Sequence, residues 1–420
     1  MTKGRLWFLA LAAALGGFLF GYDTAVINGG EQQIQSVWSL SSVLHGWVMS
    51  SALWGTVIGA VCGGKVCDRL GRKQTLFWVG VFYLVSAVWS AFAAGPDDLM
   101  IARFLGGLGV GASSIAAPVY IAEISPADQR GKLGGLFQFN IVLGMVVSQF
   151  VNWAIGTAGL GDATWRWMLG AEAVPALAFT VVTLFMVESP RYLAMKEGEA
   201  ASRRFADGGD CPCSKRRDAA SPFFSKANSR PIMLAFAVAA FNQLSGINAM
   251  MYFAKRVFEM AGMTESAALG TAAGLSIVLG LGTFAGLFLI DRLGRRTLLI
   301  VGSIGCIVAH FAAAAAFLGD LGILAAACIF LFIVFFAMGQ GVVIWVFISE
   351  IFPQKFRAQG QSWGSFTHWS FCATLTFVFP LMAAKWPTWS IFAFFGVCLV
   401  AHLLWAAFIC PETKGRALEE

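Results

Sequence analysis

Long apolar runs separated by short polar segments form the pattern of this chain. Twelve runs predict membrane-spanning helices, near residues 6–28, 46–66, 75–94, 99–121, 134–156, 168–187, 232–254, 267–290, 298–318, 322–349, 360–384 and 389–410. Each run is close to the roughly 20 apolar residues that a helix needs to cross a bilayer. The first run follows two basic residues, as a secretion signal does, but it continues without a polar cleavage region and further spans follow. The pattern therefore predicts an all-α membrane protein whose first run is a transmembrane helix.

One long polar stretch, 188–231, divides the predicted spans into two groups of six. It is rich in Arg, Lys, Asp and Ser, and the run from Gly208 to Cys213 is expected to interrupt helices there. We therefore expect an N-terminal six-helix half over 1–187, a linker of loops and short helices over 188–231, and a C-terminal six-helix half over 232–420.

Composition and charge agree with a membrane protein. Hydrophobic residues make up 58% of the 420 positions and charged residues 12%, whereas soluble domains carry about 25% charged residues. Of the basic residues, 24 lie on the side that holds both termini and 4 on the opposite side. Because Lys and Arg collect in cytoplasmic loops, we expect both termini and the 188–231 linker in the cytoplasm and the chain in the inner (plasma) membrane. The net charge of +6 then reflects topology, and we expect the lipid bilayer as a partner and no nucleic acid.

Three charged motifs recur in the same order in both halves, which predicts a parallel internal repeat. The pairs are separated by 223 to 227 positions: Asp68–Lys73 with Asp291–Arg296, Ala122–Pro126 (and Arg130) with Ser349–Pro353 (and Arg357), and Glu188–Arg191 with Glu412–Arg416.

Together with further motifs, these repeats resemble the sugar porters of the major facilitator superfamily, above all the bacterial proton-coupled monosaccharide symporters of xylose or glucose type. The further motifs are Gly17–Ile27, Arg103–Gly111, Gln243–Asn248, Trp345–Pro353 and Pro411–Glu419. The resemblance covers nearly the whole chain. It implies the major facilitator fold, with twelve transmembrane helices in two halves, and transport by alternating access.

Two charges within apolar spans are candidates for proton coupling. Asp23 lies in the first span and Arg103 opens the fourth, and charges inside a membrane span are costly unless they are paired or functional. Protonation of Asp23 would release Arg103 and change the packing of the two helices. The resemblance assigns this pair to coupling, although a static pair that fixes helix packing is the alternative. Glu172 is a second candidate proton site, or else a helix-end cap or a glutamate that faces the lumen.

Amide side chains suit a sugar, because each amide offers both hydrogen-bond donors and an acceptor. Asn242, Gln243 and Asn248 lie close together in sequence beside Gly246, which is expected to break the helix. The family's sugar contacts fall on these positions, although the family usually has glutamine where this chain has Asn242. The alternative is that amides only hold helices together.

Several weaker sugar-site candidates accompany the amides: Gln149, Tyr252, Trp345, His368 and Trp369. An indole can cover the apolar face of a pyranose ring, and the two tryptophans match the family's aromatic contacts. Gly341-Val342 stands where the family commonly has Gly-Pro, so we expect this helix to bend less easily.

Charged residues of the repeated motifs predict a cytoplasmic charge network that holds the cytoplasmic ends of the helices closed. Exposed ion pairs contribute at most about 1 kcal/mol each, so only a network has a sizeable effect. Its candidate members are Asp68, Arg69, Arg72, Glu123, Arg130, Glu188, Arg191, Asp291, Arg292, Arg295, Glu350, Arg357 and Glu412.

No arrangement of residues predicts an enzyme, a cofactor or a metal site. The glycines of Arg103–Gly111 lie inside an apolar span without a preceding strand, which favours close helix packing over dinucleotide binding. Cys211 and Cys213 have no histidine nearby, so we interpret them as loop cysteines.

The sequence therefore predicts a transporter that imports a monosaccharide, a hexose or a pentose, together with a proton. We expect it to act as a monomer. Two alternatives remain open: a facilitative sugar or polyol uniporter in which Asp23 stays paired, and a transporter-like sugar sensor.

Overall fold

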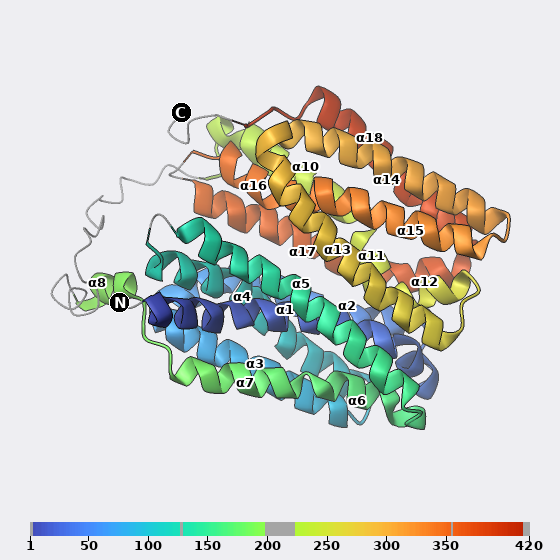
Figure 1. Cartoon of the computed structure of the whole chain (residues 1–420), viewed down its shortest axis with the longest axis horizontal. Helices are drawn as coiled ribbons and strands as arrows, with labels where there is room; N and C mark the ends of the chain where they lie inside the picture. The colour runs from blue at the N-terminus through green and yellow to red at the C-terminus, as the bar shows by residue number, and fades with distance from the viewer. Residues whose placement is uncertain (1–2, 127–128, 198–222, 354–355, 415–420) are drawn as a thin grey trace. The chain divides into compact units, whose positions relative to one another are not determined.

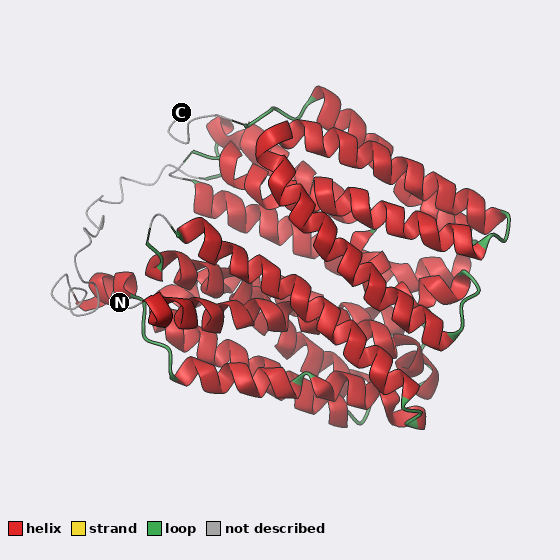
Figure 2. Cartoon of the chain, in the orientation of Figure 1, coloured by secondary structure: helices red, strands yellow, loops and turns green. Residues whose placement is uncertain are grey.

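The computed structural model describes residues 3–126, 129–197, 223–353 and 356–414. Within these ranges every regular element is helical and no strand occurs (Figure 2). The Cys211 and Cys213 pair and most of the 188–231 linker lie outside the described residues. The linker's described ends hold α8 (Pro190–Glu197) and the short η2 (Lys226–Asn228).

Twelve described helical segments are long and apolar enough to cross a membrane, which confirms the twelve predicted spans. In the first six spans the helices are α1 (Lys3–Val37), α2 (Ser42–Leu70), α3 (Arg72–Phe92), α4 (Pro96–Ile124), α5 (Arg130–Thr157), η1 (Gly161–Ala163), α6 (Thr164–Ala171) and α7 (Ala173–Leu184). Most helices extend beyond the apolar runs, because polar residues at their ends continue the backbone hydrogen bonding into the connections.

The last six spans contain more interrupted helices than the first six. Their elements are α10 (Ser229–Leu244), α11 (Ile247–Tyr252), α12 (Ala254–Met260), α13 (Glu265–Leu293), α14 (Arg295–Leu318), α15 (Gly322–Phe336), η3 (Ala337–Gly341), α16 (Val342–Ile351), α17 (Arg357–Lys385) and α18 (Thr388–Phe408). The predicted break at Gly246 is confirmed: this residue has φ +86°, separates α10 from α11, and a Cβ there would lie 2.8 Å from the ring of Phe395. Only glycine combines that backbone conformation with that contact.

The same helix packing occurs in both halves of the sequence. In the first half α3 packs against α4 and α7, and in the second half α14 packs against α15 and α18 (Figure 1). In each half, the helix of the third span thus packs against the helices of the fourth and sixth spans. The repeat predicted from the charged motifs therefore extends to helix packing.

Glycines allow the helices of the first half to approach closely. A Cβ on Gly107 or Gly111 would overlap backbone atoms of α2 at Ala52 and Thr56. The glycine-rich stretch is thus a packing surface of α4, as its position within an apolar span predicts.

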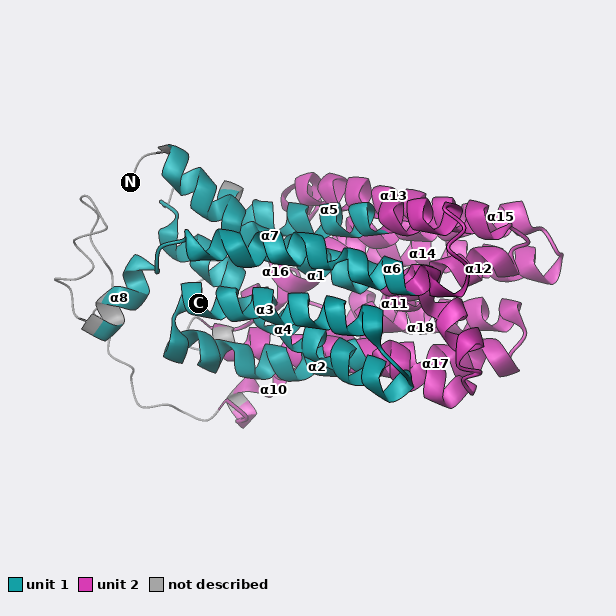
Figure 3. Cartoon of the chain, turned by 90° about the horizontal axis from the view of Figure 1, so that it is seen from below, with its two compact units in different colours: residues 1–26, 51–148, 166–221 teal, residues 27–50, 149–165, 222–420 magenta. Residues whose placement is uncertain are grey.

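Contacts divide the chain into two compact units: unit 1 comprises residues 1–26, 51–148 and 166–221, and unit 2 comprises 27–50, 149–165 and 222–420 (Figure 3). Each unit has its own apolar core. That of unit 1 includes Tyr83 and Phe179, and that of unit 2 includes Phe347 and Phe352. This division passes through α1, α2, α5 and α6, so the halves 1–187 and 232–420 with the linker 188–231 remain a prediction from the repeat.

Candidate functional site

A buried ion pair in unit 1 joins α1 to α4. Nη1 of Arg103 lies 2.5 Å from Oδ1 of Asp23, and neither side chain is more than 3% exposed. Nη2 of Arg103 also donates to the backbone carbonyl of Asp23 at 3.0 Å. Protonation of Asp23 would therefore neutralise the carboxylate that pairs with the guanidinium and would leave the carbonyl contact in place.

Glu172 is buried beside this pair, 2% exposed, where α6 gives way to α7. Its side chain lies within hydrogen-bonding reach of Asp23. Glu172 is the N-cap residue of α7, but its side chain makes no capping hydrogen bond to that helix. Because two ionised carboxylates can only accept hydrogen bonds, this contact forms when one of them carries a proton. Unit 1 thus brings together an arginine and two carboxyl groups that can share one proton.

Space around the pair depends on a small neighbour in α4. A Cβ on Gly106 would lie 2.5 Å from Oγ of Ser86 and 3.4 Å from Oδ1 of Asp23. A larger residue at this position would therefore press on the carboxylate that pairs with Arg103.

The amides predicted to bind sugar form one cluster in unit 2, around the break at Gly246. Nδ2 of Asn248 donates to Oε1 of Gln243 at 2.7 Å. Nε2 of Gln243 lies 3.2 Å from Oδ1 of Asn242 and 3.0 Å from Nε2 of His368. Gln243 is 1% exposed and Asn248 partly exposed. The break thus turns three amides of one chain segment toward one another and toward α17.

Aromatic rings adjoin the amides. The ring centroid of His368 lies 5.0 Å from that of Trp345 in α16 and 5.0 Å from that of Trp369 in α17. Trp369 is buried and Trp345 partly exposed. Nε2 of Gln361 donates to the backbone carbonyl of Trp345 at 3.0 Å. The structure therefore places a histidine and two indoles beside the amide cluster.

Gln149 in α5 is held by a residue that the sequence did not single out. Nδ2 of Asn28 in α1 donates to Oε1 of Gln149 at 3.0 Å, and Oδ1 of Asn28 accepts from the backbone N–H of Lys255 at the start of α12. Nε2 of Gln149 is buried and has no partner among the described residues. Tyr252 is buried at the end of α11. Asn28 thus fixes the orientation of the Gln149 amide. The N–H groups of Gln149 Nε2 remain available to donate hydrogen bonds.

The tenth span contains a π turn, Ala337–Gly341, directly before Val342. The carbonyl of Gln340 in this turn accepts from Nδ2 of Asn242 at 3.4 Å, and Nε2 of Gln340 lies 3.1 Å from Nδ1 of His402. Such turns are frequent at functional sites. The helix is therefore irregular beside Gly341-Val342 although it has no proline there, and buried side-chain contacts support the irregularity. The expectation that this helix bends less easily stays a prediction.

In the first half, the repeated charged motif forms a compact network. Nε and Nη2 of Arg72 each donate to Glu123 at 3.0 Å, and Asp68 lies 3.2 Å from Nη2. Glu188 accepts from the backbone N–H groups of Arg72 and Lys73, at 2.9 and 3.2 Å. A carboxylate thus caps the start of α3, where the helix dipole favours negative charge.

The second half repeats this network. Arg295 donates to Glu350 at 3.0 and 2.7 Å, and Asp291 lies 3.1 Å from its Nη1. Glu412 accepts from the backbone N–H groups of Arg295 and Arg296, at 3.0 and 3.1 Å. Partial burial opposes ionisation of Glu412, but four backbone N–H bonds outweigh it and lower its pKa. Sequence motifs 223 to 227 positions apart therefore make the same contacts.

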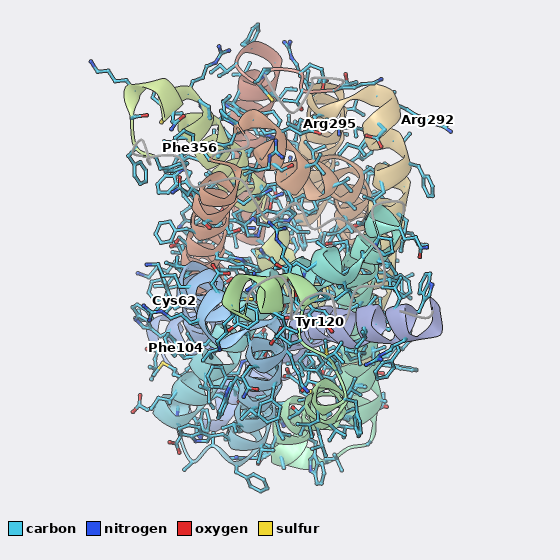
Figure 4. All side chains as sticks on the ribbon, turned by 90° about the vertical axis from the view of Figure 1, so that its left-hand side faces the viewer. Cys62, Phe104, Tyr120, Arg292, Arg295 and Phe356 are labelled. Atoms are coloured by element: carbon cyan, nitrogen blue, oxygen red, sulfur yellow. The ribbon has the colours of Figure 1, made fainter. Side chains whose placement is uncertain are left out.

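Other predicted members take a different part in this charged region. Arg69 and Arg292 are exposed, and their backbone carbonyls accept from Tyr192 and Lys414; Figure 4 looks at this region and labels Arg292 and Arg295. The side chain of Arg191 is exposed. That of Arg130 lies outside the described residues, and Arg357 is half-buried. Among the pairs given above, each joins residues of the same half.

No group of three or more His, Cys, Asp or Glu side chains in the described residues could hold a metal ion. Each of the four histidines contacts a different polar group: His45 contacts Glu31, His310 the carbonyl of Ser245, His368 Gln243, and His402 Ser303.

A family model described as "Sugar (and other) transporter" matches residues 9–420. This chain belongs to the sugar transporter family. The resemblance to major facilitator sugar porters, drawn from the motifs, is thereby confirmed.

Curated relatives of this sugar transporter match it along its whole length. An arabinose-proton symporter of Bacillus subtilis is 32% identical over 439 residues, and a D-xylose-proton symporter of Escherichia coli is 31% identical over 471 residues. Each alignment covers 100% of this chain and 95% of the relative. A glucose transport protein of Synechocystis is 33% identical and covers 97% of this chain and 95% of its own.

Solved structures confirm the fold class. An inward open structure of the xylose transporter of E. coli has a TM-score of 0.86 at 29% identity, with 98% of each chain covered. A partially occluded inward open structure of that transporter has a TM-score of 0.85 at 27% identity. The family member described here therefore has the major facilitator fold and is a multi-pass membrane protein.

Proposed function

We propose that this transporter imports a monosaccharide together with a proton by alternating access. The observation that carries the proposal is the buried contact of Asp23 with Arg103 and Glu172, because a sugar site alone needs no titratable carboxylates inside a span. Relatives named as proton symporters of arabinose and xylose support it.

The coupling step follows from the charges around Asp23. When Asp23 is ionised, it neutralises Arg103 and the pair is stable in its buried position. A proton on Asp23 removes this attraction and leaves Arg103 with the carbonyl contact to α1. Glu172 offers a neighbouring acceptor for the same proton. Proton binding and release therefore change the interaction between α1 and α4, which are the helices that join at this pair.

The sugar-binding step uses unit 2. Gln243, Asn248 and Asn242 present donors and acceptors at the break in the seventh span, and Trp345 and Trp369 present apolar ring faces beside them. Sugar hydroxyls both donate and accept, and the C–H face of a pyranose packs on an indole. The amides hydrogen-bond to one another, so sugar binding would exchange these internal hydrogen bonds for bonds to the ligand.

The test is sugar uptake by the purified chain in proteoliposomes. Radiolabelled arabinose, xylose and glucose are offered with and without an inwardly directed proton gradient. We expect at least one sugar to accumulate above its external concentration only with the gradient. Equilibration without accumulation at every gradient would establish the uniporter, in which Asp23 stays permanently paired. Saturable binding without any uptake would establish the sensor.

We also propose that both termini are cytoplasmic, that the membrane is the inner (plasma) membrane, and that the monomer is the transporting unit. The 24-to-4 distribution of basic residues supports the orientation. Alternating access in the proposed function needs only one chain, since both the carboxylate pair and the amide cluster are complete within it.

A further inference from the structure

A second buried charge cluster lies far along α1 from the amino terminus and has no part in the sites above. It consists of Glu31 in α1, His45 in α2 and Arg256 in α12, all in unit 2 (Figure 3). The side chains of Glu31 and His45 are 0% exposed and that of Arg256 is 17% exposed. A charged residue inside a membrane span is costly unless it is paired or functional.

Both oxygens of the Glu31 carboxylate have hydrogen-bond partners. Nε of Arg256 donates to Oε1 and Nη2 to Oε2, both at 2.8 Å, in the fork geometry of a bidentate pair. Nε2 of His45 lies 2.9 Å from Oε2, and since a carboxylate only accepts, this nitrogen carries the hydrogen. Nη2 of Arg256 also donates to Oε1 of Gln35 at 2.6 Å. Through this one carboxylate, α2 and α12 are both joined to α1.

The cluster joins residues from the two halves of the sequence. Glu31 follows the first residue of α1 by 28 positions, or about 42 Å along the helix at ~1.5 Å per residue. One turn earlier on the same face, Asn28 accepts from the backbone N–H of Lys255. Successive polar residues of α1 therefore bind successive residues of α12, directly after the breaks that divide the seventh span at Gly246 and Phe253.

A buried ion pair is suited to a contact that must break and re-form. Removing two charges from water costs nearly as much as their attraction returns, so a fully paired cluster adds little net stability. Exposing both partners together restores their hydration, whereas losing one partner leaves the other buried and uncompensated. Such a contact can therefore separate at little net cost when all of its members are exposed together, whereas loss of one member disfavours the closed arrangement.

We propose that Glu31, His45 and Arg256 form a latch that holds this end of the helix bundle closed and that separates when the end opens to admit sugar. The opening itself rests on the proposed function. The latch includes α12, which follows the amide-bearing break, so closure of this end and the position of the break are linked.

Hydrogen–deuterium exchange of the full chain in lipid nanodiscs tests the latch. We compare backbone exchange over residues 27–37, 42–50 and 254–260 in the parent, in Glu31→Gln and in Arg256→Gln. The matched control is Asp320→Asn, the same loss of charge at an exposed carboxylate of this unit that lies outside the three segments. This control should behave as the parent.

We expect exchange in the three segments to rise by about tenfold or more in both latch variants, because each leaves a buried group without its partner. The double variant Glu31→Gln/Arg256→Gln should rise no further than either single change. Unchanged exchange in the single variants would overturn the latch. So would an equal rise throughout the chain, including α14 and α15, because Glu31 would then be a general packing residue.

Arg256→Lys keeps the protein measurable if the other variants fold poorly. It retains the charge but loses the fork, so we expect a smaller rise confined to the same three segments, and no rise would again contradict the proposal. The measurement needs no sugar and no proton gradient. A chain that fails to transport sugar can therefore still show the latch, and a chain that transports sugar can be found to lack it.

Discussion

At the scale of single residues, the chemistry of this transporter concentrates in buried polar groups whose partners are few and specific. Asp23 has Arg103 and Glu172, and Gln243 has Asn248, Asn242 and His368. A change of one atom type in such a group removes a hydrogen bond or a charge without removing volume. Isosteric substitutions are therefore the informative ones.

Asp23→Asn should abolish sugar accumulation and leave sugar exchange intact. The amide has the shape of the protonated acid and cannot ionise, while the amide cluster lies elsewhere in the chain. The measurement compares gradient-driven uptake with exchange of labelled for unlabelled sugar in the same vesicles. Asp97→Asn, the same change at an exposed residue of α4, is the control and should accumulate sugar as the parent does. If Asp23→Asn also concentrates sugar, the carboxylate does not couple transport to protons.

Gln243→Ala or Asn248→Ala should weaken sugar binding by about 1–3 kcal/mol, since each leaves polar groups without partners. Binding is measured by titration calorimetry with the sugar that the transport assay identifies. Gln74→Ala, on the exposed face of α3, is the control and should bind with the parent's affinity. Parental affinity in both cluster variants, with melting temperatures unchanged, would place the sugar elsewhere.

At the scale of elements, breaks in the helices decide where side chains can converge. Gly246 ends α10 in a left-handed conformation and sets Asn242 and Gln243 beside Asn248. An uninterrupted helix would place residues five apart on different faces, because one turn takes 3.6 residues. The cluster therefore exists because the helix is broken.

Gly246→Ala should destabilise the chain by more than Gly262→Ala. Both glycines have φ +86°, so both alanines carry the left-handed strain of about 1–2 kcal/mol. A Cβ on Gly262 meets nothing within 4 Å, whereas one on Gly246 meets Phe395 at 2.8 Å. Thermal unfolding in detergent, followed by tryptophan fluorescence, compares the two. Equal losses would mean that the Phe395 ring moves aside without cost.

Glu412→Gln should weaken the start of α14 by about 1 kcal/mol at neutral pH, as expected for a carboxylate at a helix N-terminus. The pKa of Glu412 is lowered in the folded chain, so its contribution is complete above the unfolded value of about 4.3 and is lost as the pH falls through the lower folded value. The unfolding free energies of parent and variant should therefore differ at pH 7 and converge below about pH 4. A constant difference across this range would contradict capping by the ionised carboxylate.

At the scale of the whole molecule, the sequence repeat and the repeat of contacts agree. Arg72 with Glu123 and Arg295 with Glu350 form the same bidentate pair, and α3 and α14 pack against corresponding helices of their halves. In the proposed function the two halves have different roles: the first carries the titratable pair and the second the amide cluster.

A reporter that fluoresces only in the cytoplasm should be active when fused after Glu420 and inactive when inserted at Gly262, in the short connection between α12 and α13. The reason is the asymmetric distribution of basic residues, which cannot readily cross the membrane. Fluorescence at Gly262 and none after Glu420 would reverse the proposed orientation.

The sequence by itself determined the twelve spans, the internal repeat, the family and the identity of Asp23 and Arg103 as charges that require an explanation. These are properties of short segments, since insertion into a bilayer depends on the length, apolarity and flanking charge of each segment. Gly246 belongs here as well, because its neighbours in sequence are also its neighbours in the break.

Only the tertiary structure decided which partner each buried polar group has. Glu172 could be a helix cap from its sequence position, and packing sets its side chain beside Asp23. Glu31 lies beyond the predicted end of the first span, and its partner Arg256 follows it by 225 positions. Such pairings depend on how each helix is rotated and which helices adjoin, and no local pattern encodes either. The apolarity that a bilayer requires determines which segments become spanning helices. The packing between these helices determines which buried polar groups come into contact.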